Sequence, residues 1–431
     1  MMMPPAADSR MDYSPATAGP RLLARPFTAL TLLVSIAVAG ATPLPARAED
    51  GTITLGSPLS LSGALSNEGK DVKEGQDLWR DYVNAHGGLK VAGKTYKVAI
   101  TYYDNASDAK ATAALTQRLI DEDHVTAILG PYSSAHTIAA APVAERRSIP
   151  LINSSGAADS INNQGYRYTF STLSPATKRL VGLIEFAAKR SPKPATLAIA
   201  VSNDAFSLDV RRGAIESANN HGIKVAFSGV YLPSGADIDS VVAQLKAAHP
   251  DIVLNAGHVE DAIAFTKELK KQGVNAKLYG YAIGPDVLGF RQALGNDANF
   301  LYSSIQWSEA VDYVGEPGFI AKSREYAQAY QAAYGHAPSY ISAQATAGCL
   351  AFQYALRRAR SLDGPDLREA LANIDVVTFF GLLKFDQRGA NVFKPNVTVQ
   401  IQGGKLYTVY PKRWAEVPAV YPGVPWTLSE R

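Results

Sequence analysis

Cysteine is almost absent from this chain. Cys349 is the only one among its 431 residues, so an internal disulfide is excluded. It lies in an apolar helical run at residues 343–355, which favours a small buried side chain over a reactive thiol. Stability must then come from packed hydrophobic cores, and the length after residue 48 suffices for two domains of ordinary size.

Charge of one sign is also scarce. The formal net charge is +3, and lysine and arginine do not cluster with aromatic residues, so nucleic acid is not an expected partner. Charged runs such as residues 267–271 are typical of the solvated face of a helix.

Several enzyme motifs are missing. The chain has no G-x-G-x-x-G and no G-x-S-x-G, and none of its seven histidines forms H-E-x-x-H. A second cysteine that could complete a thiolate metal site is lacking as well. We therefore expect no catalysis, no cofactor and no metal.

The first 48 residues are expected to be a cleaved signal peptide. Arg21 and Arg25 precede apolar residues 27–41, and Ala46-Arg47-Ala48 supplies the small-x-small cleavage pattern. The apolar stretch is shorter than the roughly 20 residues that span a bilayer, which disfavours an uncleaved membrane anchor. No cysteine lies directly after the predicted cleavage site, where a lipid would be attached, so we expect a soluble periplasmic protein rather than a lipoprotein.

Strands and helices alternate along the chain. The first series has expected strands at residues 53–56, 97–103 and 125–129, and helices at 71–86 and 106–121, the latter capped near Ser107-Asp108. The second series has expected strands at 197–201, 225–230, 252–255, 277–281 and 300–305, and helices at 178–189, 206–221, 238–248 and 259–273. This alternation predicts an α/β protein of two Rossmann-like lobes with parallel sheets.

The remaining residues complete the lobes. Further helices are expected at 318–334, 341–360 and 365–373, then a strand pair at 381–385 and 397–402 joined by a turn at 386–389. The prediction assigns 49–172 plus 306–377 to lobe 1 and 173–305 plus 378–412 to lobe 2, and leaves the tail 413–431 unplaced. Crossings are expected near 171–174, 304–307 and 378–380, forming a hinged cleft of the kind that buries small ligands.

Two loops stand out as a cradle for a polar group. Gly130-Pro131-Tyr132-Ser133-Ser134 and Pro150-Leu151-Ile152-Asn153-Ser154-Ser155-Gly156-Ala157-Ala158 each follow an apolar run with small hydroxylic residues and glycine. Buried parallel strands end in this way where a loop faces a ligand.

The chain resembles a known family, the periplasmic solute-binding proteins of branched-chain amino acid type (Leu/Ile/Val-binding-like) ABC transporters. The resemblance covers residues 51–411 and rests on the order and spacing of several short stretches: residues 56–63, 69–79, 84–88, 103–108, 202–206, 237–238, 251–253 and the two cradle loops. It implies a type I periplasmic binding fold with a three-segment hinge.

The resemblance also implies where a ligand carboxylate would bind. In that family it is held by main-chain N–H and hydroxyl groups of the loop matching Ser133, Ser134 and Ala135, which suits an anion because a helix N-terminus offers several donors. Ser134 is the principal candidate, although a helix cap without a ligand is the simpler alternative. Ser155 matches a position that contributes main-chain contacts.

Departures from the family pattern affect the ammonium site. Ala282 stands where amino acid binders carry an acid for the ligand's ammonium, and Ala157 where they often carry threonine. A buried unpaired ammonium is costly, so the acceptors are expected to be absent unless Asp286, four residues on, replaces the acid.

Other candidate site residues differ in kind. Glu68 replaces an aromatic residue and would accept from a ligand hydroxyl, amide or ammonium, or else be a solvated loop carboxylate. His258 replaces a tyrosine and would donate to a ligand oxygen, or else bond to backbone. Tyr132, Phe206 and Trp307 follow strand ends and would either stack on a planar ligand or pack within the lobes.

We therefore expect a transport protein that closes over a small acid. Ligand would dock on the lobe with Ser134, and closure would bring Phe206, His258 and the loop after Tyr281 over it. An aromatic or other organic acid is favoured, with a branched-chain amino acid or small amide as the alternative. The expected partner is a membrane permease, with a monomer sufficient; a ligand-sensing domain is the alternative class.

Overall fold

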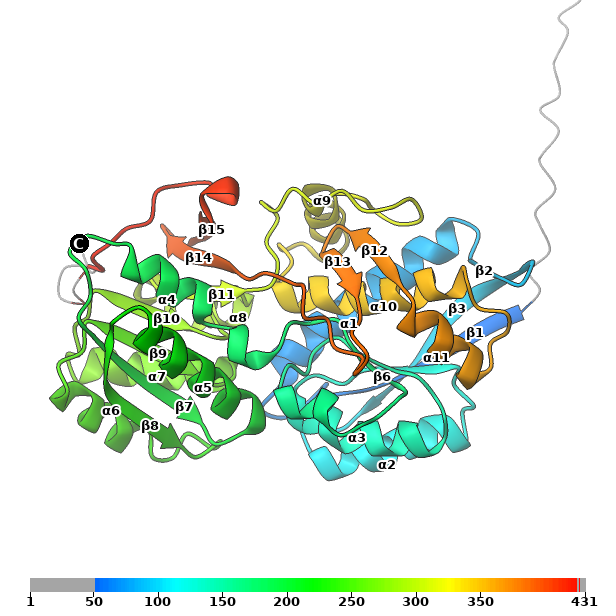
Figure 1. Cartoon of the computed structure of the whole chain (residues 1–431), viewed down its shortest axis with the longest axis horizontal. Coiled ribbons are helices and arrows are strands. Elements are labelled where there is room, and N and C mark those ends of the chain that lie inside the picture. The colour runs from blue at the N-terminus through cyan, green and yellow to red at the C-terminus, as the bar shows by residue number, and fades with distance from the viewer. Residues whose placement is uncertain (1–50, 425, 427–431) are drawn as a thin grey trace, which may run out of the picture. The chain divides into compact units, whose positions relative to one another are not determined.

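The computed structural model describes residues 51–424 and 426. The signal peptide predicted at residues 1–48 lies outside the described residues. Within the described part the chain forms two α/β lobes, each built on its own sheet, and a separate two-stranded hairpin (Figure 1).

The first lobe is built on a six-stranded sheet. Its spatial order is β2 (Leu89–Val91), β3 (Lys94–Asp104), β1 (Gly51–Leu59), β4 (Ala127–Leu129), β5 (Leu151–Asn153) and β6 (Thr169–Ser171). Neighbouring strands are parallel except β2 and β3. β4, β5 and β6 are buried along their whole length. β4 is wholly apolar, whereas β5 ends in Asn153 and β6 has one apolar residue, Phe170, between Thr169 and Ser171.

Helices from both ends of the chain cover this sheet. They are α1 (Ser66–Ala85), α2 (Ala109–Asp121), α3 (Ser134–Arg146), α9 (Ser323–Tyr334), α10 (Tyr340–Leu356) and α11 (Gly364–Ala372). Asp108 caps α2 as predicted, its carboxylate accepting from the N–H groups of Lys110 and Ala111. Every residue of α10 is buried, including Cys349, and this helix packs along α1.

The second lobe is built on a seven-stranded sheet. Its spatial order is β15 (Lys405–Tyr410), β14 (Val397–Gln402), β11 (Tyr302–Ile305), β10 (Leu278–Tyr281), β9 (Ile252–Ala256), β7 (Thr196–Ser202) and β8 (Lys224–Tyr231). The strands from β8 to β11 are parallel, whereas β14 runs antiparallel to both of its neighbours.

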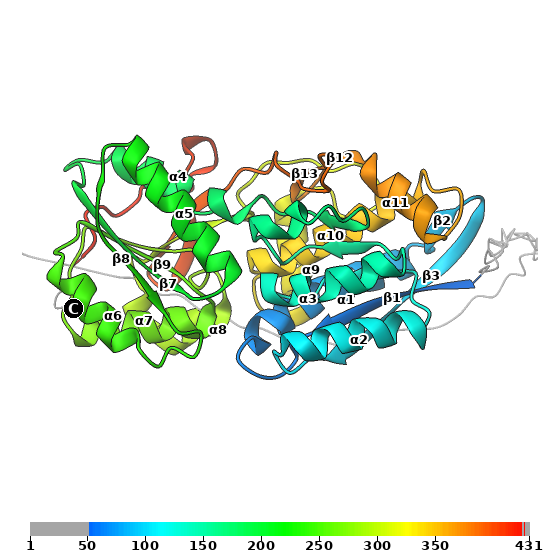
Figure 2. The same cartoon turned by 60° about the horizontal axis from the view of Figure 1, so that its bottom comes forward.

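Five helices cover the second sheet on its two faces, as Figure 2 shows. They are α4 (Val181–Ala188), α5 (Ala205–Asn220), α6 (Ile238–Ala247), α7 (Val259–Lys271) and α8 (Leu288–Leu294). Short 3-10 turns complete the described elements: η1 (Asp159–Asn163), η2 (Ala176–Lys178), η3 (Gly295–Ala298) and η4 (Lys412–Trp414).

Three chain segments connect the lobes and are hydrogen-bonded to one another. Asn391 N donates to the carbonyl oxygen of Ser171, the last residue of β6, at 3.0 Å. Ser174, in the segment after β6, donates its N–H to Gln306 Oε1, in the segment after β11, at 3.0 Å. The third crossing therefore lies at residues 385–396, and the prediction of a crossing near 378–380 is wrong. Those residues form a tight turn, in which Phe380 N donates to Thr378 Oγ1 at 3.2 Å.

The predicted pairing of residues 381–385 with 397–402 is also wrong. β13 (Gly381–Lys384) pairs with β12 (Asp375–Thr378), while β14 lies between β11 and β15 in the second sheet. The turn before Gly381, which has φ +119°, reverses the chain and gives β13 its partner locally. The sequence prediction divides lobe 1 from lobe 2 after residue 377, and this hairpin pairs residues from both sides of that boundary. The boundaries of the lobes stay a prediction.

One stretch of the chain has the residue spacing of a phosphate-binding loop. Residues 88–95 read Gly-Leu-Lys-Val-Ala-Gly-Lys-Thr, which fits G-x-x-x-x-G-K-[ST]. A phosphate-binding loop leads from a strand into a helix, whereas here Ala92 and Gly93, both at positive φ, turn β2 back onto β3. The match is therefore a β-hairpin.

In the C-terminal tail, which the sequence left unplaced, Trp414 Nε1 donates to Asp312 Oδ1 at 2.8 Å, and residues 416–424 and 426 pack on the second lobe. The Tyr302 hydroxyl donates to Val420 O at 2.7 Å, and Trp426 Nε1 donates to Val274 O at 2.7 Å.

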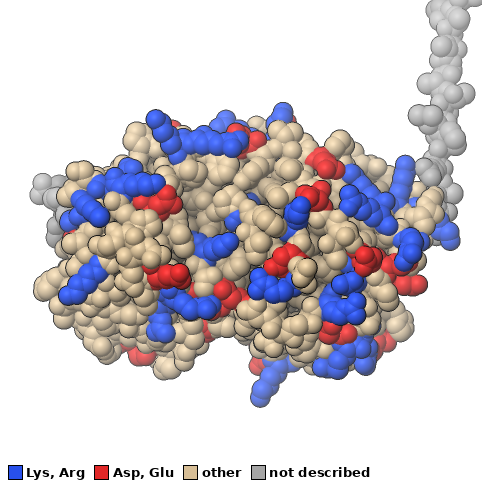
Figure 3. All heavy atoms as spheres, viewed as in Figure 1, with Lys and Arg blue, Asp and Glu red and all other residues tan. Residues whose placement is uncertain are grey.

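Acidic and basic side chains are interspersed on both lobes over the face of the protein that Figure 3 shows.

The close packing of α1 on α10 gives a stability prediction. A Cβ at Gly75 would collide with the carbonyl oxygen of Ser342, so Gly75→Ala should destabilise the fold by about 1 to 3 kcal/mol. Gly182 in α4 has open space, so Gly182→Ala should be neutral or stabilise by up to about 1 kcal/mol. Urea unfolding of both variants checks the pair, and equal effects would contradict it.

Candidate ligand-binding site

The two predicted cradle loops lie side by side at the edge of the first sheet. Ser133 precedes α3 with φ +78°, an uncommon conformation for a side-chain-bearing residue. The Ser134 hydroxyl oxygen accepts from the N–H groups of Ala157 at 3.1 Å and Ala158 at 3.0 Å. This contact ties the loop after β4 to the loop after β5, and the Ser134 hydroxyl proton remains available to donate.

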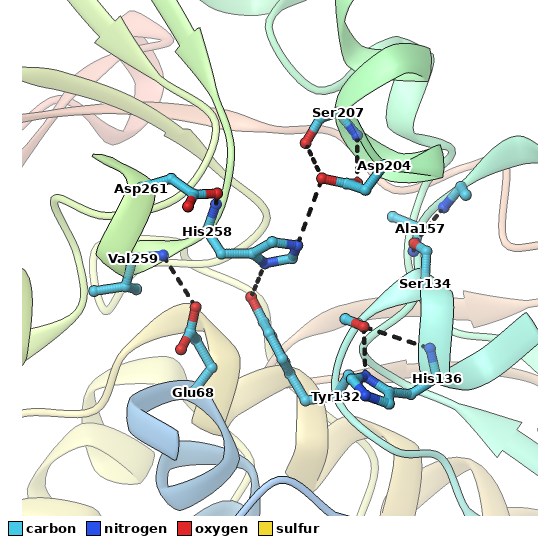
Figure 4. A network of polar contacts seen from close by, with 12 residues as sticks. Glu68, Tyr132, Ser134, His136, Ala157, Asp204, Ser207, His258, Val259 and Asp261 are labelled. Atoms are coloured by element: carbon cyan, nitrogen blue, oxygen red, sulfur yellow. Dashed lines mark hydrogen bonds and ion pairs between the residues drawn. The ribbon is translucent and has the colours of Figure 1, made fainter. Parts of the chain in front are cut away.

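The second lobe contributes the opposite wall. Phe206 stands in the first turn of α5, and His258 directly precedes α7. Figure 4 shows the His258 ring between the Tyr132 hydroxyl and the Asp204 carboxylate. The Tyr132 hydroxyl lies 3.3 Å from His258 Nδ1, and Asp204 Oδ2 lies 3.9 Å from His258 Nε2. Asp204 in turn accepts from Ser207, which orders the start of α5.

A cavity of about 10 Å³ lies between these walls. That is room for about one water molecule. Seven of the twelve predicted site residues line it: Tyr132, Ser133, Ser134, Ser155, Ala157, Phe206 and His258. The lining residues that the sequence prediction missed are Leu173, Arg179, Ile283, Tyr340 and Gln344. No aspartate or glutamate is among these twelve described residues.

Four predicted residues lie away from the cavity. Ala135 is exposed on α3, and the backbone of the buried Ala282 faces Arg179. Tyr281 is inside the second lobe, where its hydroxyl bonds to Thr266 Oγ1 at 2.7 Å. Trp307 packs edge-on against Tyr326 and donates to Ser323 Oγ at 3.3 Å, so its indole is held inside the fold.

Glu68, the fifth, bridges the lobes. Its Oε1 accepts from Val259 N, the first N–H of α7, at 3.1 Å, and its side chain is fully buried (Figure 4). Burial raises the pKa of Glu68, while the neighbouring His258 and the Val259 N–H lower it. Of the two interpretations of Glu68, the solvated carboxylate does not fit.

Arg179 is the most informative residue that the sequence reasoning missed. Its side chain is only 2 % exposed, its Nε donates to Ala282 O at 3.0 Å, and its guanidinium lies 4.3 Å above the ring of Tyr340. Its Nη2 has no hydrogen-bond partner among the described residues. A buried donor of this kind normally has an acceptor, and a guanidinium is well suited to bind a carboxylate.

Gln344 completes this end of the cavity. Its Nε2 donates to Ser155 Oγ at 3.4 Å, and its buried Oε1 has no partner among the described residues. The sequence carried no signal for Gln344, Tyr340 or Arg179, because none of them follows a strand of the predicted cradle.

Two buried acids lie behind Tyr340. Asp286 Oδ2 accepts from Tyr340 N at 3.1 Å, and burial raises the pKa of Asp286 to about 6 although Arg179 lowers it. Asp71 accepts from the hydroxyl of Ser339, the N-cap of α10, and burial raises the pKa of Asp71 to about 7. Asp286 lines a different pocket, of about 310 Å³, together with Trp307 and Tyr340.

A profile of the periplasmic binding protein family matches residues 52–405. The chain belongs to this family. It is a type I periplasmic binding protein of the branched-chain amino acid type, so the resemblance and the fold class predicted from sequence are confirmed.

Relatives agree with this assignment. The Leu/Ile/Val-binding protein homolog 8 of Brucella abortus (strain 2308) is 27 % identical over 382 residues, 84 % of this chain and 91 % of the relative. The isoleucine complex of LivJ from Streptococcus pneumoniae superposes with a TM-score of 0.72 at 21 % identity, over 84 % of this chain and 100 % of LivJ. A solute-binding protein from R. palustris with benzoate superposes with a TM-score of 0.72 at 18 % identity, over 86 % and 98 %.

Within residues 51–424 and 426, no helix has the length and apolar character needed to cross a membrane.

The buried carboxyl of Asp71 should make stability depend on pH. Its folded pKa of about 7 lies above the ordinary value of 3.8, so the folded protein holds this proton longer than the unfolded chain does, and the carboxyl opposes folding increasingly as pH rises from about 4 to 7. Asp71→Asn removes this opposition and keeps an acceptor for Ser339. The stability of the variant relative to the natural protein should therefore rise by up to about 4 kcal/mol across that range.

Urea unfolding from pH 4 to pH 8 measures this effect. Asp239→Asn, which removes an exposed carboxylate from α6, is the control. Parallel pH profiles for Asp71→Asn and the natural protein would contradict the prediction.

Proposed function

We propose that this protein is the extracytoplasmic substrate-binding component of an ABC importer and that it captures a small carboxylate-bearing solute, with aromatic or other organic acids favoured. It delivers the solute to a membrane permease by closure of its two lobes. The family, the relatives named for Leu/Ile/Val binding and the transporter proteins among its structural neighbours support this role.

The observation that carries the ligand class is the Nη2 of Arg179 in a cavity without an acidic side chain. A carboxylate there would accept from Arg179 and from the hydroxyls of Ser134 and Ser155. An amino acid would also place an ammonium in the cavity, where no lining side chain carries the opposite charge.

Aromatic side chains support a planar ligand. The rings of Tyr132, Phe206 and Tyr340 surround the cavity, and His258 supplies a polar group on the second-lobe wall. Offset or edge-on packing against such rings favours an aromatic acid over an aliphatic one of equal size by about 1 kcal/mol. The benzoate complex of the R. palustris neighbour shows that proteins of this fold accept such a ligand.

Closure follows from the size of the cavity. A space of about 10 Å³ cannot hold a benzoate-sized acid, so the lobes must separate before ligand enters, and the side chains that line the cavity must move to make room for it. The crossings at residues 385–396 and at Ser174 and Gln306 form a hinge about which the two sheets move as bodies.

A branched-chain amino acid is the second candidate ligand. Asp286 Oδ1 and Glu68 Oε2 are buried and have no partner among the described residues, so either carboxylate is a possible acceptor for an ammonium if side chains rearrange on binding. The isoleucine in the LivJ complex belongs to this class.

A ligand panel separates the two classes. Protein refolded to remove carried-over ligand should be stabilised in thermal-shift assays by acids without an amino group, such as benzoate, because Arg179 needs only the carboxylate. Matched amines without a carboxylate should have no effect. Stabilisation by leucine, isoleucine or valine alone would overturn the organic-acid proposal and favour the amino acid.

Arg179 gives a sharper test. Arg179→Met keeps the length and apolar stem of the side chain but removes its charge, so the affinity for the stabilising acid should fall by about 2 to 5 kcal/mol in calorimetry. Lys224→Met removes an exposed positive charge at the start of β8 in the same lobe, away from the hinge and from the cavity lining, and should leave affinity unchanged. An Arg179→Met protein that is folded and binds normally would remove Arg179 from the site.

A further inference from the structure

Glu68 spans the cleft without lining the ligand cavity. It lies in the first turn of α1 in the first lobe, and its acceptor contact goes to Val259 N of the second lobe. A fully buried carboxylate is costly unless it is hydrogen-bonded, so this position is held for a reason other than packing.

The group that Glu68 contacts is a helix N-terminus. The first N–H groups of a helix have no acceptor within it, and the helix dipole favours a negative charge at that end. Helix α7 has its own capping box, in which Asp261 Oδ2 accepts from His258 N at 3.2 Å, and Glu68 adds an acceptor for Val259 N, the first N–H of the helix. The acceptor is present only while the lobes are together, because Glu68 and α7 belong to different lobes.

Two further contacts join the lobes at the same place. The Tyr132 hydroxyl lies 3.3 Å from His258 Nδ1, and Asn67 Nδ2 donates to Glu260 Oε1 at 2.9 Å. The first is part of the cavity wall, and the second is exposed to solvent. Glu68 is thus the buried contact of the three that does not border the ligand.

We propose that Glu68 is a clasp that caps α7 in the closed form and so sets how long the closed protein retains its ligand, without touching that ligand. The proposal rests on the proposed function, since retention presupposes a bound solute. When the lobes separate, water replaces Glu68 at Val259 N, and α7 is left with its own capping box. Truncating Glu68 should therefore raise the dissociation rate and leave the encounter of ligand with the open protein unchanged.

Three variants test the clasp. Glu68→Ala removes the cap, Glu68→Gln keeps an acceptor oxygen but removes the charge, and Asn67→Ala removes the exposed neighbouring contact. We expect benzoate dissociation, followed by stopped flow, to accelerate roughly two- to thirtyfold in Glu68→Ala, as loss of a helix cap would give. Glu68→Gln should show part of this effect and Asn67→Ala little, and the observed association rate of Glu68→Ala should stay alike or rise with its fraction of separated protein.

A second readout needs no ligand. The natural cysteine is fully buried, so dyes can be attached at Lys110→Cys on α2 and Ala243→Cys on α6, both at exposed positions in different lobes. Energy transfer should report a larger separated population in Glu68→Ala than in the natural protein or in Asn67→Ala. Circular dichroism melts of each variant confirm that both lobes remain folded.

The outcomes are distinct. A folded Glu68→Ala protein with unchanged lobe separation and unchanged benzoate dissociation would overturn the clasp. An association rate that falls while dissociation is unaltered would overturn it too, because that pattern indicates a direct ligand contact. If benzoate does not bind the natural protein, the choice of ligand has failed, and the lobe separation alone decides the clasp.

Discussion

The buried guanidinium of Arg179 is the group around which the site is organised. A charge removed from water needs compensation, and here it comes from three sides: the Ala282 carbonyl, the face of Tyr340 and the nearby carboxyl of Asp286. None of these satisfies Nη2. Under the proposed function, this donor is the one that the carboxylate of the ligand would occupy.

Two acids are buried near this charge, and Arg179 favours the ionised form of one of them, Asp286. Asp286 holds the backbone of Tyr340 in place, and Asp71 holds Ser339 at the start of α10, so two carboxyls with raised pKa values fix the residue that stacks on Arg179. Both lie beside the cavity rather than in its wall. Their position separates the support of the guanidinium from its recognition of ligand.

The sequence predicted the half of the site that depends on strand ends. A buried parallel strand that ends in small hydroxylic residues places them at the edge of its sheet. The pattern therefore predicted Ser133, Ser134, Ser155 and Ala157, which line the cavity, while their contact with a ligand stays a prediction. Arg179 follows a crossing instead, and its direction depends on how that crossing bends, which no local pattern encodes. The pairing of β13 failed for a related reason: alternating residues specify a strand, whereas its partner was decided by the turn before Gly381.

The division of the site between lobes then accounts for closure. The hydroxyl donors of Ser134 and Ser155 belong to the first lobe, whereas Arg179 is fixed to the second through Ala282 O. A ligand carboxylate that bonds to both sets gains its full interaction only when the lobes meet, so binding favours the closed form by the difference between the two sets of contacts. Contacts such as Glu68 with Val259 need no ligand and favour the same form. Under the proposed function, the closed state therefore has two separate sources of stability, one supplied by the solute and one built into the chain.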